Sequence, residues 1–349
     1  MKSNYKRLGD YIRQVDVWNK DLISTELLGI NINKIFMPSV ANVIGTDLRN
    51  YKLLSKGQFA CNPMHVGRDE KLPIALYLSD APAIVSPAYF VFEVTDSNLL
   101  CEYLMLWFRR LEFDRECWFY TDASVRGGIS WESICDMKLP IPEINEQRRI
   151  VKAYNTIERR IEFKRKIIDN LEAQVESLYS NIVSGKQPNN VVSEIAIVET
   201  GKRPISTNKG NIPLVGAGGI MDFIDSFNYD SPILTMGRVG THGIIQRFDD
   251  RCWVSDNALV IKTKHYEYVY QFLKKVDYTI LNRGSTQPLI TQTDVKQLDI
   301  YLPSDDELNN FNRFSNAIMA GFSKNNQEML KLFELQVSII NSISNQLRY

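Results

Sequence analysis

Apolar residues recur at alternating intervals of four and three residues in two long stretches of the chain. This spacing is typical of the packed stripe of a coiled-coil helix. The first stripe consists of Ile150, Tyr154, Ile157, Ile161, Ile168, Leu171, Val175, Leu178 and Ile182. The second consists of Phe311, Ile318, Phe322, Met329, Leu332, Ile339 and Ile343. A single helix of this length would expose its stripe to water, so we expect the two helices to pair.

The two stripes belong to an internal repeat. Residues 124–182 align with residues 285–343 without a gap, and the members of every aligned pair are 161 positions apart. At this offset Lys164 is equivalent to Asn325, and both residues interrupt a stripe. If the helices pair antiparallel, these two polar residues fall in neighbouring layers, where they would fix register and orientation. The alternative is that Lys164 extends to solvent. Glu172 lies off the stripe, so we expect its neutralisation to be nearly silent.

A block of strand-like segments precedes each long helix. In the second block, residues 211–224, 231–248 and 252–263 read as β-strands with glycine turns, followed by a helical pattern at 266–275. The first block repeats this order with residues 57–78 and 81–94, followed by a helical pattern at 99–111. The first block is longer, and we expect its extra residues in surface loops, where added length costs least.

These patterns predict an α+β fold with a pseudo-twofold internal repeat. Two globular domains, residues 1–142 and 186–303, are separated by two long helices that form an antiparallel coiled coil. The helices are expected at residues 143–185 and 304–349. Gly185 and Pro188 are expected to end the first helix and to open a turn.

The chain of 349 residues carries 41 basic and 41 acidic residues. A net charge of zero argues against an indiscriminately basic nucleic-acid binder, although residues 148–166 hold eight basic residues and two acidic ones. No run is apolar enough to span a membrane, and the first residues are charged where a signal peptide needs an apolar core. We therefore expect a cytoplasmic protein without a membrane partner.

The sequence lacks the motifs of DNA methyltransferases, dinucleotide-binding enzymes and nucleotide hydrolases. An adenine methyltransferase needs a (D/N)PP(Y/F) loop, and the fragments NPMH at 62–65 and SPAY at 86–89 each lack a required residue. The GAGG segment at 216–219 is not the GxGxxG fingerprint and is expected to be a β-turn, and no GxxxxGK(S/T) loop occurs. Glu162 and Lys164 resemble the end of a nuclease ExK motif. Because they lie in a coiled-coil heptad, we favour their interpretation as part of a salt-bridged helix face.

Metal-binding and disulfide patterns are also missing from the sequence. Five cysteines show no CxxC pair, and three histidines form neither HExxH nor a Cys/His cluster. We expect reduced, mostly buried cysteines. No metal site, cofactor site or catalytic residue is therefore expected in this chain.

Several segments resemble one known family over essentially the whole sequence. They are LPIPEINEQRRIV at 139–151, NIPLVGAGG at 211–219, ILTMGRVGTHG at 233–243 and WVSDNALVI at 253–261. The chain resembles the DNA specificity subunit of a Type I restriction-modification system. The resemblance implies that residues 1–142 and 186–303 are target-recognition domains, each reading one half of a bipartite site in double-stranded DNA, with the paired helices holding them apart.

The resemblance also implies partners and their cofactors. These are two modification subunits that methylate adenine from S-adenosylmethionine, and restriction/translocase subunits that use ATP with Mg²⁺. One departure is that EQRRI at 146–150 becomes ELNNF at 307–311, so contacts made through this segment are expected to be weaker on one side.

Residue type and loop placement suggest which side chains contact DNA. Phosphates call for Lys, Arg, hydroxyls and backbone amides, whereas base edges call for Arg, Lys, Asn, Gln and small hydroxyls. The candidates are Asn62, His65, Arg68, Arg126, Lys202, Arg203, Arg238, Thr241, His242, Ser285, Thr286 and Gln287. For each of them the alternative is an ordinary solvated loop side chain.

Two other functions remain open at this point. One is a coiled-coil adaptor that joins partner subunits without reading sequence. The other is a single-chain DNA methyltransferase or nuclease, against which the missing motifs argue. We favour a non-catalytic, sequence-specific DNA-binding subunit of a phage-defence system.

Overall fold

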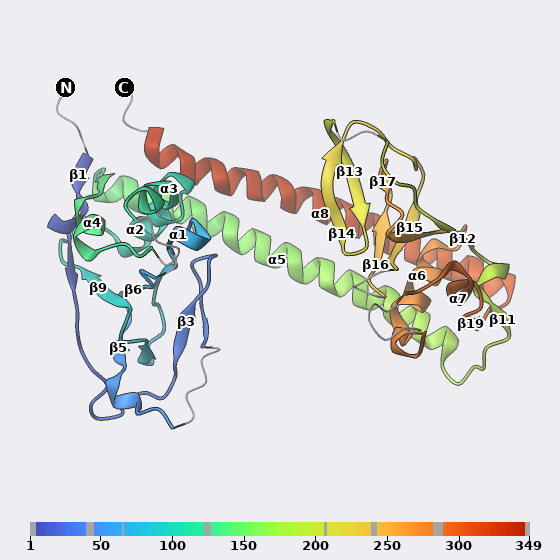
Figure 1. Ribbon diagram of the computed structural model, residues 1–349, viewed down its shortest axis with the longest axis horizontal. Helices are drawn as coiled ribbons and strands as arrows, with labels where there is room; N and C mark the ends of the chain where they lie inside the picture. Colours follow the sequence, from blue (N-terminus) through green and yellow to red (C-terminus); the bar gives the residue numbers. More distant parts are fainter. Residues whose placement is uncertain are drawn as a thin grey trace. The chain divides into compact units, whose positions relative to one another are not determined.

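The computed structural model describes residues 5–39, 45–64, 66–121, 127–205, 208–238, 243–281 and 289–345 (Figure 1). The chain divides into two compact units. The first unit comprises residues 1–163 and 329–349, and the second comprises residues 164–328. Each long helix therefore contributes to both units.

The first unit is built on a four-stranded antiparallel sheet in the order β2-β9-β6-β7. These strands are β2 (Ile12–Gln14), β6 (Phe59–Cys61), β7 (Ile74–Leu76) and β9 (Phe90–Val94). Two further pairs are β3 (Leu28–Ile30) with β4 (Phe36–Pro38), and β5 (Lys52–Leu54) with β8 (Ala83–Val85). The rings of Phe59 and Phe92 stack at 5.0 Å on neighbouring strands of the sheet, in the core of the unit.

The second unit repeats this sheet in the order β12-β18-β15-β16, again with antiparallel neighbours. Its strands are β12 (Ile197–Thr200), β15 (Ile233–Gly237), β16 (Ile245–Phe248) and β18 (Ala258–Lys262). A hairpin of β13 (Lys209–Gly216) and β14 (Gly219–Ile224) is extended by β17 (Trp253–Val254), which runs parallel to β13. The two sheets therefore share one strand order and one path of the chain.

Smaller elements follow the repeat at the same offset as the sequence. Helix α4 (Trp131–Asp136) corresponds to α7 (Gln292–Lys296), and their N-caps are Ser130 and Thr291. Each cap oxygen accepts a backbone N–H of the first turn, which satisfies a group that the helix leaves unpaired. Strand β10 (Lys138–Pro140) pairs with β1 (Tyr5–Arg7), as β19 (Asp299–Ile300) pairs with β11 (Asn190–Val191).

The remaining short elements of the first unit are α1 (Val66–Asp69), α2 (Cys101–Phe108), α3 (Leu111–Phe119) and the 3₁₀ turns η1 (Leu8–Asp10) and η2 (Leu48–Asn50). Those of the second unit are η3 (Val192–Glu194), α6 (Tyr266–Lys275) and η4 (Tyr278–Leu281). The predicted helix at 266–275 is α6. The extra length of the first block does not lie only in surface loops, because part of it forms α3, which buries Phe113 and Cys117 in the core.

The long helices are α5 (Ile144–Val183) and α8 (Asp305–Asn345), drawn in green and red in Figure 1. In the first unit, Ile150 near the start of α5 shares a core with Ile343 near the end of α8. In the second unit, Val175 near the end of α5 shares a core with Phe311 near the start of α8. The helices therefore pair antiparallel in each unit. No helix in the described part of the chain is long and apolar enough to cross a membrane.

The stripe residues differ in burial according to what covers them. Those with under a tenth of their surface exposed are Ile150, Tyr154, Ile161, Val175, Phe311, Leu332 and Ile343. The half-buried ones are Ile157, Ile168, Leu171, Leu178, Ile182, Ile318, Phe322, Met329 and Ile339. Five of the buried residues also belong to the core of a globular block, whereas Ile161 and Leu332 are buried but belong to neither core.

One buried position of α5 differs from the expected stripe. Tyr179 is buried in the core of the second unit, whereas its neighbour Leu178 is half-buried. The Tyr179 ring meets Tyr268 of α6 at 5.1 Å, and Tyr268 meets Phe311 at 5.5 Å. A straight helix drifts from a strict seven-residue repeat, and the globular block covers the face onto which the drift brings Tyr179.

The polar interruptions of the stripes meet in the second unit. Lys164 Nζ donates to Asn325 Oδ1 at 2.7 Å and lies 2.6 Å from a carboxylate oxygen of Glu328. Only 18% of the Lys164 side chain is exposed, so it does not simply extend to solvent. These contacts give Lys164 a structural role in helix pairing, which supports the helix-face interpretation over a nuclease motif.

The segments at the start of the two helices, 146–150 and 307–311, differ in sequence, and the structure explains the change from glutamine at 147 to leucine at 308. Gln147 is fully buried, donates to the carbonyl oxygens of Asn98 and Pro142, and accepts the N–H of Leu100. Leu308, its equivalent on α8, is buried in the apolar core of the second unit instead. The glutamine therefore serves the chain's own fold, and its loss is compensated by apolar packing.

Candidate nucleic-acid interface

Two strands of the second unit, β12 and β15, lead to candidate side chains at one end of the sheet, on either side of β18. Beyond β12, the Gly201 N–H donates to the Ala258 carbonyl at 3.0 Å, and beyond β15, the Arg238 N–H donates to the Asn257 carbonyl at 3.2 Å. Gly201 and Arg238 thus flank the start of β18 from either side. We call residues 201–205, 238, 243–244 and 255–257 the loop edge of the second unit.

Lys202 and Arg203 leave the sheet from a fixed point of this loop edge. The Lys202 N–H donates to the Val254 carbonyl at 2.9 Å, and the Lys202 carbonyl accepts the indole N–H of Trp253 at 2.8 Å. A Cβ at Gly201 would lie 2.2 Å from the Ser255 carbonyl oxygen, so only glycine fits there. Both cationic side chains are exposed. Their backbone is held while their charges face water, as phosphate contacts require.

Arg238 differs from an ordinary solvated arginine. Its side chain is half-buried, and its buried Nε finds no hydrogen-bond partner among the described residues. The Arg238 carbonyl accepts the N–H of Ile290 at 3.0 Å, which brings the chain after candidates Ser285, Thr286 and Gln287 back to the same edge.

Residue-type reasoning missed a turn at this loop edge. Ser255, Asp256 and Asn257 connect β17 to β18, and the Ala258 N–H donates back to the Ser255 carbonyl at 3.1 Å. Asp256 and Asn257 are exposed directly before β18, beside the hydrogen bonds that Gly201 and Arg238 make there. The available signal was a run of turn-forming residues between two apolar strands. An exposed asparagine at such an edge has the donor and acceptor needed to read adenine.

The first unit has an equivalent edge. The Val15 N–H beyond β2 donates to Val91 at 2.8 Å, and the Ile129 N–H donates to Pro63 at 3.2 Å, as Ile290 does to Arg238. Asn62 beyond β6 accepts the Met64 N–H through Oδ1, so its side chain shapes its own loop.

Arg68 on α1 is engaged locally. It forms two hydrogen bonds of 2.7 and 2.9 Å with the Asp69 carboxylate, which raise the pKa of the guanidinium. Its charge is therefore partly offset before any phosphate approaches. The candidates His65, Arg126, Thr241, His242, Ser285, Thr286 and Gln287 lie outside the described residues.

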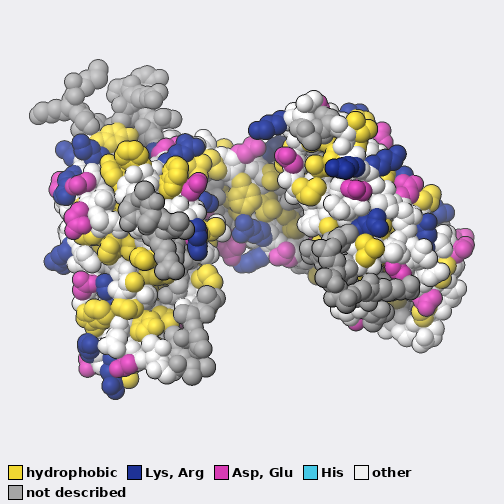
Figure 2. Space-filling model, in the orientation of Figure 1, with side chains coloured by type: hydrophobic (Ala, Val, Ile, Leu, Met, Phe, Trp, Pro, Cys, Tyr) yellow, Lys and Arg dark blue, Asp and Glu magenta, His cyan; other side chains and the backbone are white. Residues whose placement is uncertain are grey.

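Charge on the molecular surface is mixed in sign. Figure 2 shows Lys and Arg side chains interspersed with Asp and Glu over the drawn face of each unit. This distribution matches the zero net charge of the chain. On the drawn face, neither sign of charge forms a continuous surface.

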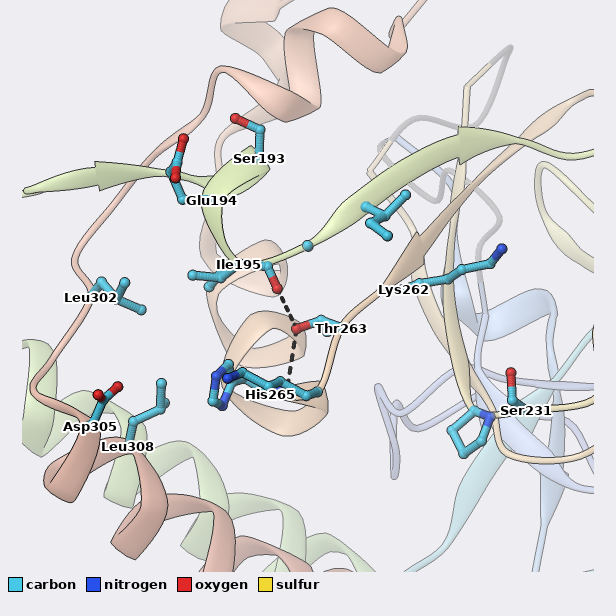
Figure 3. A pocket seen from close by; sticks show the side chains of 14 residues that line it. Ser193, Glu194, Ile195, Ser231, Lys262, Thr263, His265, Leu302, Asp305 and Leu308 are labelled. Carbon is cyan, nitrogen blue, oxygen red and sulfur yellow. Dashed lines mark hydrogen bonds between the residues drawn. The ribbon is translucent and has the colours of Figure 1, made fainter.

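A pocket of about 650 Å³ lies at the opposite edge of the second unit's sheet, beside the start of α8 (Figure 3). There the Thr263 hydroxyl donates to the Ile195 carbonyl at 2.7 Å and accepts the backbone N–H of His265 at 3.0 Å. His265 Nδ1 lies 3.0 Å from Asn312 Nδ2 of α8. Burial, reinforced by Lys264, lowers the pKa of His265, which favours the neutral ring that can accept from the amide. Residues of the sheet and of the start of α8 both line this pocket, which is separate from the loop edge.

The enzyme-like fragments take structural forms. Gly216 pairs with Gly219 across the tight turn of the β13–β14 hairpin, so GAGG leads into a strand and not into the helix of a dinucleotide site. The cysteines, at 61, 101, 117, 135 and 252, are free, and all but Cys101 are buried. Within the described ranges, no three His, Cys, Asp or Glu side chains are grouped so that they could hold a metal ion.

Comparison with known proteins places this geometry in a family. The model of the Type I restriction modification DNA specificity domain matches residues 74–173 and 191–348. A Haemophilus influenzae protein named as a type I restriction enzyme specificity subunit is 21% identical over 123 residues, and the match spans only about a third of that relative's length (32%) and 32% of this chain. The crystal structure of a Type-I restriction-modification S subunit from M. genitalium superposes with a TM-score of 0.62. It covers 97% of this chain and 95% of that one at 13% identity, which shows a shared fold.

Proposed function

Because the chain belongs to the family of the Type I restriction modification DNA specificity domain, we propose that it directs a methyltransferase and restriction complex to a bipartite DNA site. In this role the chain binds double-stranded DNA and reads its sequence but performs no chemistry. Residues 1–142 and 186–303 are then its target-recognition domains, and residues 143–185 and 304–349 are its coiled-coil helices.

One observation carries this proposal. Both units present a loop edge at the same end of the same sheet, where the chain returns from Ile129 to Pro63 in one unit and from Ile290 to Arg238 in the other. Two equivalent edges built from different side chains suit two readers of different sequences. A site in two halves follows, because each reader contacts its own set of base pairs.

Partners supply the chemistry in this proposal. Two modification subunits would bind S-adenosylmethionine and methylate adenine, and restriction/translocase subunits would use ATP with Mg²⁺. The assignment rests on the sequence, which carries neither a (D/N)PP(Y/F) loop nor a GxxxxGK(S/T) loop. Such a complex acts on DNA in the cytoplasm. Two exposed arginines, Arg148 and Arg149, have asparagines as equivalents at 309 and 310, so partner contacts through them are expected on one side only.

The test is a genome-wide map of methylated adenine in host cells with and without the gene for this chain. We expect a split motif, two short specified sequences around an unspecified spacer, only when the chain is present. A motif that persists without the chain, or the absence of any motif with it, would contradict the proposal.

A binding assay separates this function from that of a sequence-blind adaptor. The assembled complex is titrated with a duplex carrying the mapped motif and with a scrambled duplex at moderate salt, because phosphate contacts alone are strongly salt dependent. A specificity subunit prefers the first duplex, whereas an adaptor binds both alike.

A further inference from the structure

Ile205 is the most exposed large hydrophobic side chain among the described residues. Its side chain is 91% exposed. Single exposed aliphatic residues are common on proteins, but most of them keep part of their surface against a neighbour. An isoleucine held almost wholly in water gains free energy from any apolar group that covers it.

Ile205 lies close along the chain to the contacts that hold the loop edge. It follows Lys202 by three residues, and the Lys202 backbone is held on both sides by hydrogen bonds to Val254 and Trp253. Pro204 precedes Ile205 and restricts the backbone before it. The exposed apolar side chain therefore lies three residues from an anchored point of the edge that we assign to DNA.

Charge around Ile205 favours DNA as its occupant. Lys202 and Arg203 are exposed in the same segment, and Arg238 lies across the start of β18, against one exposed carboxylate, Asp256. Cations that flank an apolar side chain suit a groove whose rim is phosphate. In the major groove, the one base-edge group that an aliphatic side chain can cover with profit is the C5-methyl group of thymine.

On the basis of the proposed function, we propose that Ile205 is a specificity-determining residue that packs against a thymine methyl group in the half-site read by the second unit. The isoleucine cannot hydrogen-bond a base, so it discriminates by covering the methyl group and by excluding water from it. Cytosine and the purines lack that group at the corresponding place in the groove.

The experiment removes the methyl group without changing base pairing. The complex of this chain with its modification subunits is first used to select its site from randomised duplexes. Each thymine of the selected site is then replaced singly by uracil, and Kd is measured at one moderate salt concentration. For the natural chain we expect one uracil in one half-site to weaken binding about fourfold, the value of one buried methyl group.

Matched variants assign that loss to Ile205. Ile205→Ala should bind the thymine duplex more weakly and should be indifferent to uracil at that one position, with every other uracil effect unchanged. Ile197→Ala is the control, because Ile197 is 61% exposed at the start of β12, the end of that strand away from the loop edge. This control should reproduce the natural uracil profile.

Three results would overturn the inference while leaving the proposed function intact. They are a half-site without thymine, an Ile205→Ala profile identical to the natural one, and a variant that binds DNA normally but loses a modification subunit. The last result would make Ile205 a protein contact. Failure to select any motif would instead overturn the proposed function, and the inference with it.

Discussion

Lys164 and Asn325, joined by a hydrogen bond of 2.7 Å, are equivalent positions of the internal repeat. They are 161 residues apart, which is the offset between the two halves of the sequence. When equivalent residues of two antiparallel helices touch, a local two-fold axis relating the helices passes near the contact. One polar layer of the helix pair is therefore formed by equivalent residues of the repeat. Because their hydrogen bond cannot form in a shifted register, this layer specifies how the helices align.

Coupling between these two residues is the first prediction. Asn325→Leu removes the acceptor and leaves Lys164 with Glu328, so we expect a loss of about 1 kcal/mol in the free energy of unfolding. Lys164→Met together with Asn325→Leu should cost less than the sum of the single changes, because neither position is then left as a polar group without its partner across the layer. Chemical denaturation of the four chains measures this, and strictly additive effects would show that the layer does not act as a unit.

The seam itself is tested by two neighbouring substitutions. Ile161 is buried, and Ile161→Asp places a charge in an apolar layer, which should cost several kcal/mol and prevent stable folding. Phe163, two residues along the same helix, is 65% exposed, so Phe163→Asp should leave the melting temperature of the isolated chain within a few degrees. Equal damage from both changes would contradict a one-sided seam.

Glu172 lies off the stripe and contacts the globular block of the second unit. Its carboxylate pairs with Arg247 at 3.0 Å, and Arg247 also pairs with buried Glu267 at 2.8 Å and stacks on Tyr270. Burial raises the pKa of Glu267, although the Arg247 charge opposes this shift. Arg247 therefore connects α5 to the globular block of the second unit through charge and packing.

From this network we predict unequal costs for its members. Arg247→Ala leaves the Glu267 carboxylate buried and unpaired, and should cost about 3 to 5 kcal/mol. Glu172→Gln removes a half-exposed partner and should cost about 1 kcal/mol or less. Lys262→Ala breaks the half-exposed pair with Glu199 and serves as the control, with a cost below about 1 kcal/mol. Urea unfolding provides the values, and an Arg247→Ala chain as stable as the control would refute the network's role.

Prediction from sequence works here where the signal is local and repeated. The alternating spacing extends over many turns, so it locates α5 and α8 to within a few residues, and the caps Ser130 and Thr291 are separated by the same constant offset. Tyr179 and α3 escape prediction, because their burial depends on which surface of the globular block covers them. The same holds for Glu172, whose partner Arg247 is distant in sequence.

The pH dependence of stability should carry a contribution from His265. Its pKa is lowered from the ordinary value near 6.5, mainly by burial, with Lys264 adding to the shift and Asp305 opposing it. The unfolded chain then binds a proton at a higher pH than the folded one. The stabilisation is complete above about pH 6.5 and is lost as pH falls through the lower folded value.

A variant without the imidazole isolates this contribution. His265→Asn cannot titrate, so its free energy of unfolding should fall less than that of the natural chain between pH 7 and pH 5. Unfolding curves at a series of pH values measure the difference. Identical slopes for the two chains would show that His265 is protonated alike in both states.

The candidate interface was only partly accessible from sequence. Cations beside glycine turns mark Lys202, Arg203 and Arg238, because turn chemistry and residue type are local properties. The pairing of Arg68 with Asp69, and the placement of Asn257 between two strand ends, are set by strand order and helix geometry. An exposed loop isoleucine such as Ile205 has no sequence signature, since its meaning comes from the edge on which it stands.

The central claim is that the two units read separate halves of one DNA site. The most direct measurement replaces residues 192–284 with the corresponding block of another family member and maps the methylated motif that the chimaeric complex produces. We expect one half of the motif to change to that of the donor while the other half and its methylation remain. A folded, active chimaera that changes both halves, or neither, would contradict it.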